Sequence, residues 1–157
     1  MKLATSTGDF SWYVDSIAEK IRAFAGLGFK YINLEQGVLT EENWQRTAHS
    51  WGEAAAETGL KLVVAHAPCL HHPCLGALNN PDDEEYRENI AAIRRSIEVC
   101  HLLDLPRIVV HACPHPSFDK ATFYRYNTMF YREFFDLMEK YHITVMTENW
   151  DNEGHLP

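Results

Sequence analysis

Three short apolar runs in this chain each end on a residue type that binds divalent metals. The runs with their final residues are KLVVA before His66, RIVV before His111 and ITVMT before Glu148. Their Val and Ile content is typical of buried strands. If these strands are parallel neighbours, their carboxyl ends lie about 4.8 Å apart, so that two imidazoles and a carboxylate can meet on one ion at about 2.0–2.2 Å. The sequence therefore predicts a metal site, and this ligand set is compatible with Zn, Mn, Mg or Co.

Each of these residues also has a plainer interpretation when it is taken alone. His66 and His111 could be neutral core histidines bonded to backbone groups, and Glu148 could pair with a neighbouring Lys or Arg. A carboxylate at the end of a buried strand is costly to desolvate unless it is paired, protonated or bound to a metal. Two histidines and a carboxylate at equal depth on adjacent strands favour the functional interpretation.

Four further residues are expected near the same site. Glu35 ends another apolar run and is suited to accept hydrogen bonds from hydroxyl groups. His115 lies in a loop at the same edge and is expected to reach a bound substrate. Trp12 and Trp150 offer apolar faces on which a ligand ring can stack, with packing in the core as the alternative. We therefore predict that Glu35, His115, Trp12 and Trp150 bind substrate.

The elements that must position these residues alternate between strands and helices. The expected strands are residues 3–6, 31–34, 61–65, 107–110 and 143–147. The expected helices are 11–27 with Trp12 on its apolar face, 40–58 from an N-cap at Thr40 to Gly59, a third from Asp82 or Asp83 to Leu103, and 120–141. The strand–helix unit recurs roughly every 30–45 residues, which implies parallel strands joined by right-handed crossovers.

Two architectures fit this alternation, a doubly wound open sheet and a (β/α)8 barrel. An open nucleotide-binding sheet normally has a glycine-rich turn after its first strand, and residues 7–9 offer only one glycine. A barrel places functional side chains at the carboxyl ends of several strands, where Glu35, His66, His111 and Glu148 fall. We therefore predict an α/β fold formed by the N-terminal five β/α units of a TIM (β/α)8-type barrel.

The length of the chain makes this barrel a truncated, partial one. A full barrel takes about 250 residues, whereas this chain has 157 and reaches only a fifth strand. We expect residues 1–157 to form a single partial barrel domain. Its first and fifth strands would have unpaired edges, so we expect a homo-oligomer in which a second copy covers them. The alternative is a piece of a longer enzyme.

Composition sets limits on partners and location. Hydrophobic residues make up 46% and charged residues 23% of the chain, which is typical of globular proteins. The net charge of −8 counts against a nucleic-acid partner. No apolar segment is long enough to span a membrane and the start lacks a signal-peptide pattern, so we expect a cytoplasmic protein without a membrane partner. Cys69 and Cys74 are spaced more loosely than zinc knuckles, which favours a solvated active-site loop.

Three motifs at the strand ends resemble those of the xylose isomerase-like TIM-barrel superfamily. They are His66-Ala67-Pro68, Val110-His111 with Pro114 nearby, and Thr147-Glu148-Asn149. This superfamily includes isomerases and epimerases of sugars and sugar phosphates, and endonuclease IV-type DNA-repair enzymes. The resemblance covers the whole chain in element order and reaches the first five of the family's eight strands.

The resemblance implies roles for the three strand-end residues. In the isomerase and epimerase branch, a carboxylate like Glu148 binds a divalent metal and takes part in proton transfer. Histidines like His66 and His111 bind either the metal or the substrate, and further Asp, His and Glu residues lie on strands six to eight. In the endonuclease branch, the same three residues would hold part of a three-zinc cluster.

Three functions remain open from the sequence. We expect a divalent-metal-dependent isomerase or epimerase, or the N-terminal part of one, which moves a proton of a sugar or sugar phosphate through an enediolate. The alternatives are an endonuclease IV-like zinc phosphodiesterase and an inactive truncated relative. Exchange of a sugar proton with solvent, cleavage of abasic DNA and failure to bind metal would distinguish the three.

Overall fold

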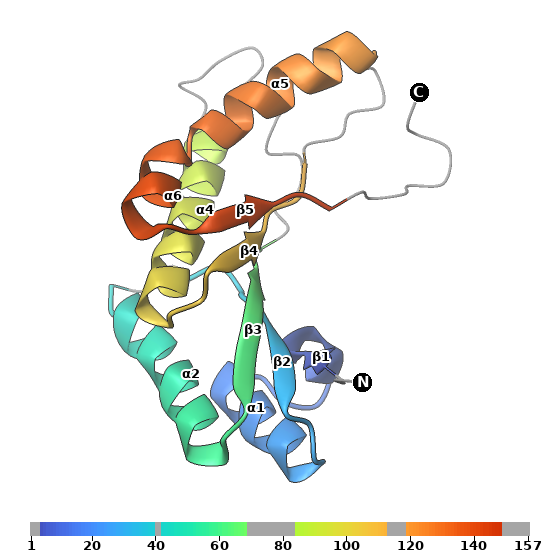
Figure 1. Cartoon of the computed structure of the whole chain (residues 1–157), viewed down its shortest axis with the longest axis vertical. Helices are drawn as coiled ribbons and strands as arrows, with labels where there is room; N and C mark the ends of the chain where they lie inside the picture. The colour runs from blue at the N-terminus through green and yellow to red at the C-terminus, as the bar shows by residue number, and fades with distance from the viewer. Residues whose placement is uncertain (1–3, 40–41, 69–83, 113–118, 149–157) are drawn as a thin grey trace.

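Five parallel strands form one curved sheet in the computed structural model, which describes residues 4–39, 42–68, 84–112 and 119–148 (Figure 1). The strands lie in the order of the sequence, and each neighbouring pair is parallel. They are β1 (Ala4–Ser6), β2 (Tyr31–Glu35), β3 (Lys61–His66), β4 (Arg107–Val109) and β5 (Thr144–Met146). The predicted α/β fold with five sequential parallel strands is confirmed.

The helices form a layer along one face of this sheet. Those that the structure describes are η1 (Thr7–Phe10), α1 (Ile17–Gly26), α2 (Trp44–Thr58), α4 (Glu84–Leu102), α5 (Lys120–Arg132) and α6 (Phe135–Tyr141). Helix α1 packs against α2, α2 against α4, and α4 against α6, while α5 extends beyond this layer (Figure 1). A sequential parallel sheet with helices outside it is the arrangement of a TIM barrel.

The core between the helices and the sheet decides which way the strand-end residues point. Leu34 of β2 and Ala65 of β3 are fully buried. Successive residues of a strand point to opposite faces, so burial of these two sends Glu35 and His66 to the other face. The core side chains contributed by the helices include Ile21, Phe24, Trp51, Ile93 and Ile97. Burial of each side chain of this size stabilises the fold by about 1.5–3 kcal/mol. A strand rotated by 180° about its axis would expose its apolar residues and is therefore disfavoured.

The first helix begins later than the predicted range of 11–27. The Ser16 side chain accepts a hydrogen bond from the amide of Glu19 at 3.5 Å, and α1 therefore starts at Ile17. The 3-10 helix η1 occupies the preceding turn with a serine cap of its own. Trp12 lies between the two helices and is 92% exposed. The prediction that Trp12 lies on the apolar face of a helix was wrong, because the Ser16 cap places the start of α1 after Trp12.

The predicted helix over 120–141 is divided into α5 and α6. Between them, the Arg94 guanidinium of α4 donates hydrogen bonds to the backbone carbonyl of Glu133 and to the carboxylate of Asp136. Phe134 is fully buried at the same point. A long-range ion pair and a buried aromatic residue thus end one helix and begin the next, and neither is visible in the local sequence.

The remaining helix boundaries agree only in part with the prediction. Helix α2 begins at Trp44, and the predicted cap Thr40 lies outside the described residues, as do Asp82 and Asp83 before α4. Gly59 ends α2 in the left-handed conformation, with φ 69°, as predicted. No helix in the described part of the chain is both long and apolar enough to cross a membrane. The single domain and the second copy at the sheet edges stay predictions.

Gly59→Ala and Gly26→Ala should change the free energy of unfolding in opposite directions. Gly59 has φ +69°, where a Cβ is disfavoured, so alanine should lower the free energy of unfolding by about 1–2 kcal/mol. Gly26 is the last residue of α1 and has no atom within 4 Å of an added Cβ, so alanine there should raise it by about 0.4–1 kcal/mol. Urea unfolding followed by circular dichroism measures both. Changes of the same sign would contradict the assigned cap.

Candidate metal centre

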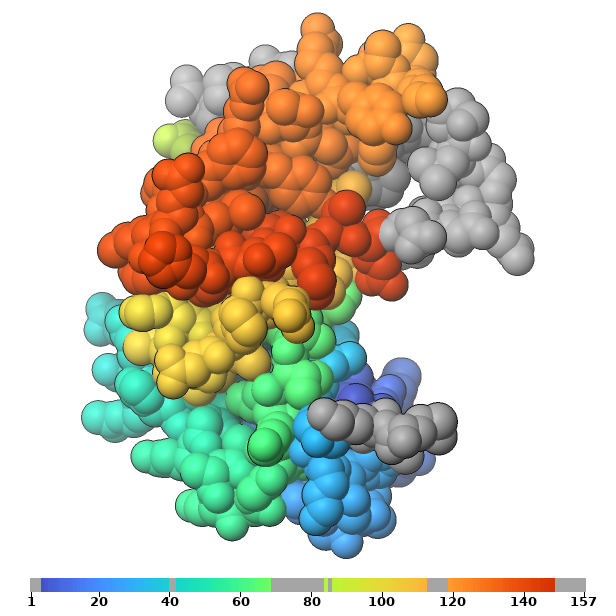
Figure 2. Space-filling view, viewed as in Figure 1, coloured from blue at the N-terminus to red at the C-terminus, as the bar shows by residue number. Residues whose placement is uncertain are grey.

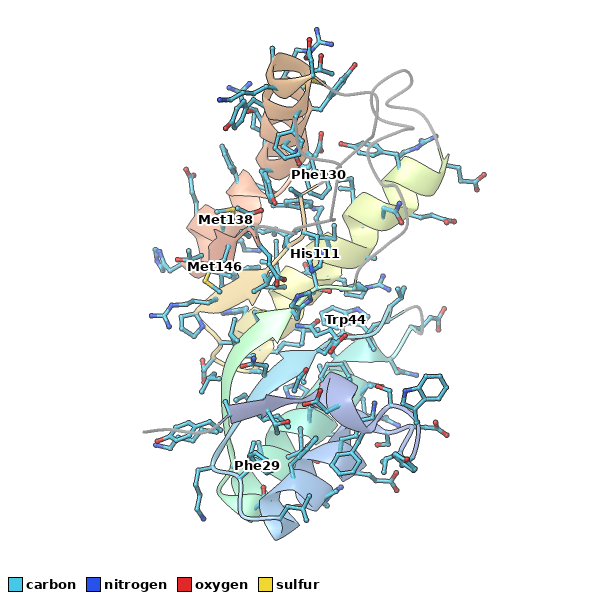
Figure 3. All side chains as sticks on the ribbon, turned by 90° about the vertical axis from the view of Figure 1, so that its right-hand side faces the viewer. Phe29, Trp44, His111, Phe130, Met138 and Met146 are labelled. Carbon is cyan, nitrogen blue, oxygen red and sulfur yellow. The ribbon has the colours of Figure 1, made fainter. Side chains whose placement is uncertain are left out.

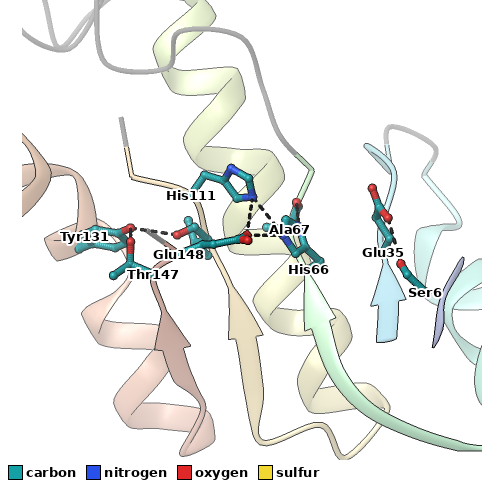
Figure 4. A network of polar contacts seen from close by, with 9 residues as sticks. Ser6, Glu35, His66, Ala67, His111, Tyr131, Thr147 and Glu148 are labelled. Carbon is teal, nitrogen blue, oxygen red and sulfur yellow. Dashed lines mark hydrogen bonds and ion pairs between the residues drawn. The ribbon is translucent and has the colours of Figure 1, made fainter. Parts of the chain in front are cut away.

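Three of the predicted residues converge at the carboxyl ends of β3, β4 and β5 (Figure 4). The Nε2 atoms of His66 and His111 are 3.0 Å apart, and Oε2 of Glu148 lies 3.5 Å from each of them. In a wider view, His111 lies at the tip of β3 in the middle of the molecule (Figure 3). The structure therefore brings the predicted ligand atoms into one triangle.

The size of this triangle fits a divalent ion. A circle through three points separated by 3.0, 3.5 and 3.5 Å has a radius of about 1.9 Å. An ion slightly out of that plane would lie about 2.0–2.1 Å from all three atoms, which is the bond length of zinc to nitrogen and oxygen ligands. Tetrahedral coordination at this length separates ligand atoms by about 3.3 Å. The three residues can therefore hold one ion.

Backbone hydrogen bonds beyond the strands keep the ends in register. They run from the amide of Gln36 to His66 O at 3.0 Å, from Ala67 to Val109 O at 2.9 Å, and from Val110 to Met146 O at 2.9 Å. In the space-filling view, the residues of β5 lie against those of β4, and these against β3 (Figure 2). The ladder thus continues past the ends of the strands to residues next to the candidate ligands.

His66 presents Nε2 to the triangle, and the hydrogen bond of its second ring nitrogen, Nδ1, determines the tautomer of the ring. Nδ1 of His66 lies 3.1 Å from the carbonyl oxygen of Ala67. Because a carbonyl oxygen only accepts, Nδ1 carries the proton in this pair, and in a neutral ring the Nε2 lone pair is left for the centre. Metal-binding histidines commonly donate their second N–H to a backbone carbonyl in this way. His66 is therefore oriented as a ligand.

Burial keeps His111 in its neutral form. Removal of the ring from water lowers the pKa of His111, and the neighbouring His66 ring lowers it further, while Glu148 and Glu35 act in the opposite direction. A neutral imidazole is the form that binds a metal. The two rings meet edge to face, with centroids 4.7 Å apart. The two rings therefore lie in direct contact, and the lowered pKa of His111 favours the form of its ring that binds an ion.

Glu148 is more open to solvent than the sequence suggested. Its side chain is 53% exposed, so the expected desolvation penalty is largely absent. Within the described part of the chain, its ion pairs are with His66 and His111 and include neither Lys nor Arg. The alternative of an ordinary surface salt bridge thus gains no support from the structure, and an exposed carboxylate remains accessible to substrate.

Glu35 lies to one side of the triangle, at the end of β2 (Figure 4). Its Oε2 accepts a hydrogen bond from the Ser6 hydroxyl at 3.1 Å, and the same hydroxyl accepts one from the amide of Gly8 at 3.2 Å. The position of an added Cβ on Gly8 would be 1.9 Å from Oε2 of Glu35. The carboxylate therefore occupies space that only a glycine leaves open.

The other predicted substrate-binding residues fall into two groups. His115 and Trp150 lie outside the described residues. Trp12 follows η1 beyond the carboxyl end of β1, and its 92% exposure excludes the alternative of core packing. Its stacking role stays a prediction.

Two residues at the site escaped the sequence reasoning. Ser6 was taken only as the end of a strand, although a serine before a 3-10 turn is a common cap. Tyr131 lies in the predicted helix over 120–141 without a predicted role, yet its hydroxyl contacts Val110 and Thr147, directly after β4 and β5. A buried tyrosine usually needs a partner for its hydroxyl, but the sequence does not say which strand supplies it.

Sequential parallel strands with metal-type ligands at their carboxyl ends define the N-terminal part of a TIM-barrel fold. The chain belongs to the xylose isomerase-like TIM barrel family, whose sequence model matches residues 13–157. This confirms the predicted family.

Individual relatives cover the two enzyme branches of the resemblance. Over 88 residues the chain is 30% identical to a probable endonuclease 4 of Methanoculleus marisnigri, covering 56% of this chain and 26% of the relative. A D-tagatose 3-epimerase-like protein superposes with a TM-score of 0.73 at 19% identity, covering 99% of this chain and 55% of that structure. The structure of the IOLI protein with a zinc atom superposes with a TM-score of 0.64 at 16% identity, covering 94% of this chain and 51% of that structure. The chain spans about half the length of these two structures.

His66→Ala and His111→Ala should each weaken zinc binding by at least about 100-fold, because each removes one of three ligands. The exposed His49 on α2 provides a matched control, and His49→Ala should bind zinc as the wild type does. Competition with a chromophoric chelator measures the dissociation constants. Equal affinity in the His66 and His49 variants would place the metal elsewhere or nowhere.

Proposed function

We propose that this chain provides the metal-binding strands of a divalent-metal-dependent isomerase or epimerase that acts on a sugar or a sugar phosphate. The observation that supports this most is the triangle of His66, His111 and Glu148, whose 3.0–3.5 Å edges fit one ion. The similar fold of the D-tagatose 3-epimerase-like protein supports a sugar as substrate. The zinc atom named with the IOLI protein favours zinc among the candidate metals Zn, Mn, Mg and Co.

The chemistry assigned to Glu148 follows from its two oxygens. Oε2 faces both imidazoles, so Oε1 is the atom that can take a proton from the sugar carbon beside the carbonyl. A bound divalent ion would supply positive charge that polarises the hydroxyl and carbonyl oxygens of the sugar. Loss of the proton gives an enediolate, and its return to the adjacent carbon gives isomerisation. Return of a proton to the opposite face of the same carbon gives epimerisation and needs a second acid there.

Glu35 is proposed to bind sugar hydroxyls beside the triangle. Ser6 holds Oε2 of this carboxylate at 3.1 Å, and the exposed carboxylate retains acceptor capacity for a hydroxyl donor. A carboxylate held by a second residue loses less conformational entropy when it binds. Trp12, His115 and Trp150 are proposed as further contacts to the sugar, Trp12 through its exposed ring.

An endonuclease IV-like zinc phosphodiesterase is the second candidate, because the relative at 30% identity is a probable endonuclease 4. The same three ligands would then hold zinc beside a phosphodiester, where a metal-activated water is the nucleophile. The net charge of −8 disfavours this candidate, since DNA-binding proteins neutralise phosphates with a basic surface.

Glu148→Gln should abolish the exchange of a sugar proton with solvent, because an amide cannot take the proton. The experiment incubates the zinc-loaded protein with D-tagatose or D-fructose 6-phosphate in D2O and follows deuterium at the carbon by NMR. His49→Ala serves as the control and should exchange at the wild-type rate.

The outcomes of this experiment separate the candidate functions. Exchange by the wild type that persists in Glu148→Gln would contradict the role of Glu148. Zinc binding without exchange, together with cleavage of abasic-site DNA, would support the phosphodiesterase. Zinc binding with neither activity would support an inactive relative.

Gly8→Ala should weaken sugar binding while zinc binding stays unchanged. The added Cβ would displace the carboxylate of Glu35 from Ser6, and we expect a loss of about tenfold in affinity, the equivalent of one hydrogen bond to a charged group. Gly37→Ala is the matched control, because no atom lies within 4 Å of its added Cβ. The KM of the exchange reaction and the dissociation constant of zinc measure the two effects. A lowered zinc affinity in Gly8→Ala would show that Glu35 acts on the metal instead.

A further inference from the structure

We propose that Tyr131 is a positioning residue for the metal centre. Its hydroxyl joins the end of β4 to the end of β5 and so aims His111 and Glu148 at the same point. The inference rests on the proposed metal site, and it assigns a role to a helix residue outside the ligand set.

The contacts of the Tyr131 hydroxyl define this role (Figure 4). Its oxygen lies 2.9 Å from the carbonyl oxygen of Val110 and 2.9 Å from Oγ1 of Thr147. The carbonyl can only accept, so the single proton of Tyr131 is donated to Val110, and the Thr147 hydroxyl donates to Tyr131 in turn. Val110 directly precedes His111, and Thr147 directly precedes Glu148. The Tyr131 hydroxyl thus contacts the residue that directly precedes each of two of the three ligands.

Tyr131 acts where the backbone ladder between β4 and β5 stops. The amide of Val110 bonds to Met146 O at 2.9 Å, and β5 ends at Met146. In a regular parallel ladder the next bond would run from the amide of Glu148 to the carbonyl of Val110. The Tyr131 hydroxyl lies at that carbonyl. A side chain of α5 therefore continues the connection of the two strands up to the ligands.

Aromatic packing holds the Tyr131 ring in place. The neighbouring Phe130 and Phe134 are buried, with ring centroids 5.2 Å apart, and the Tyr131 ring lies 5.2 Å from that of Phe130. Figure 3 places Phe130 at the end of α5, above His111. Burial raises the pKa of Tyr131, with a smaller opposing effect from the Thr147 hydrogen bond. The phenol therefore keeps its proton and donates over the whole physiological range.

Loss of this hydroxyl should affect the metal before it affects the fold. Metal–ligand bonds tolerate deviations of about 0.2 Å, so small shifts of the strand ends weaken binding. The rest of β4 and β5 keeps its ladder, and the aromatic ring keeps its packing in Tyr131→Phe. Groups that orient metal ligands typically change affinity by about 10–100-fold when they are removed.

The test compares Tyr131→Phe with Tyr124→Phe, a matched control on the exposed side of α5. We expect the zinc dissociation constant to rise about 10–100-fold in Tyr131→Phe and to stay unchanged in Tyr124→Phe. The absorption spectrum of the cobalt-loaded protein should change in Tyr131→Phe alone. Thr147→Val removes the second hydroxyl, and its effect should not add to that of Tyr131→Phe, because both break one connection.

A second readout needs no metal. The histidine ring 15N shifts of the metal-free protein report the contact between Nε2 of His66 and Nε2 of His111, and they should change in Tyr131→Phe but not in Tyr124→Phe. If the wild type binds no zinc, the proposed function fails, and these ring shifts still decide the inference. Lowered thermal stability in Tyr131→Phe with unchanged zinc affinity, cobalt spectrum and ring shifts would overturn it and leave Tyr131 a structural residue.

Discussion

The register of the parallel sheet is the constraint on which the candidate site depends. Each strand contributes one side chain at its carboxyl end, and these side chains meet only if the ends are level. Backbone hydrogen bonds that continue one residue past β3 and β4 keep them level, through the amides of Ala67 and Val110. A slip of one residue would turn a ligand toward the helices, because side chains alternate between the faces of a strand. The buried Ala65 and Ile108 oppose such a slip.

The strands and their final residues could be predicted from the sequence because both signals are local. An apolar run is visible as a run, and the polar residue at its end stands out against it. The starts of helices were less predictable. Ser16 caps α1, whereas the apolar spacing in the sequence had placed Trp12 inside this helix and did not indicate the later start. The break before Phe135 depends on Arg94, which lies about forty residues earlier in the chain. Such contacts are set by tertiary packing, which a single sequence does not display.

The site itself could be predicted as a set of residues but not as a geometry. The sequence identified His66, His111 and Glu148, while the edges of 3.0–3.5 Å required the structure. It also suggested a buried Glu148, whereas the two histidines are the more buried members of the triangle. The carboxylate is thus the member of the triangle that solvent reaches most easily.

The same construction orients the two carboxylates on either side of the imidazole pair. Ser6 bonds directly to Glu35, and the Tyr131–Thr147 pair holds the strand end that carries Glu148. In the first case a hydroxyl bonds to the carboxylate itself, and in the second it contacts the residue directly before Glu148. Hydroxyls do this without adding charge, so neither carboxylate is neutralised by the group that orients it. Under the proposed function, one carboxylate binds the ion and takes a proton while the other accepts hydrogen bonds from the sugar, and both tasks begin from a carboxylate.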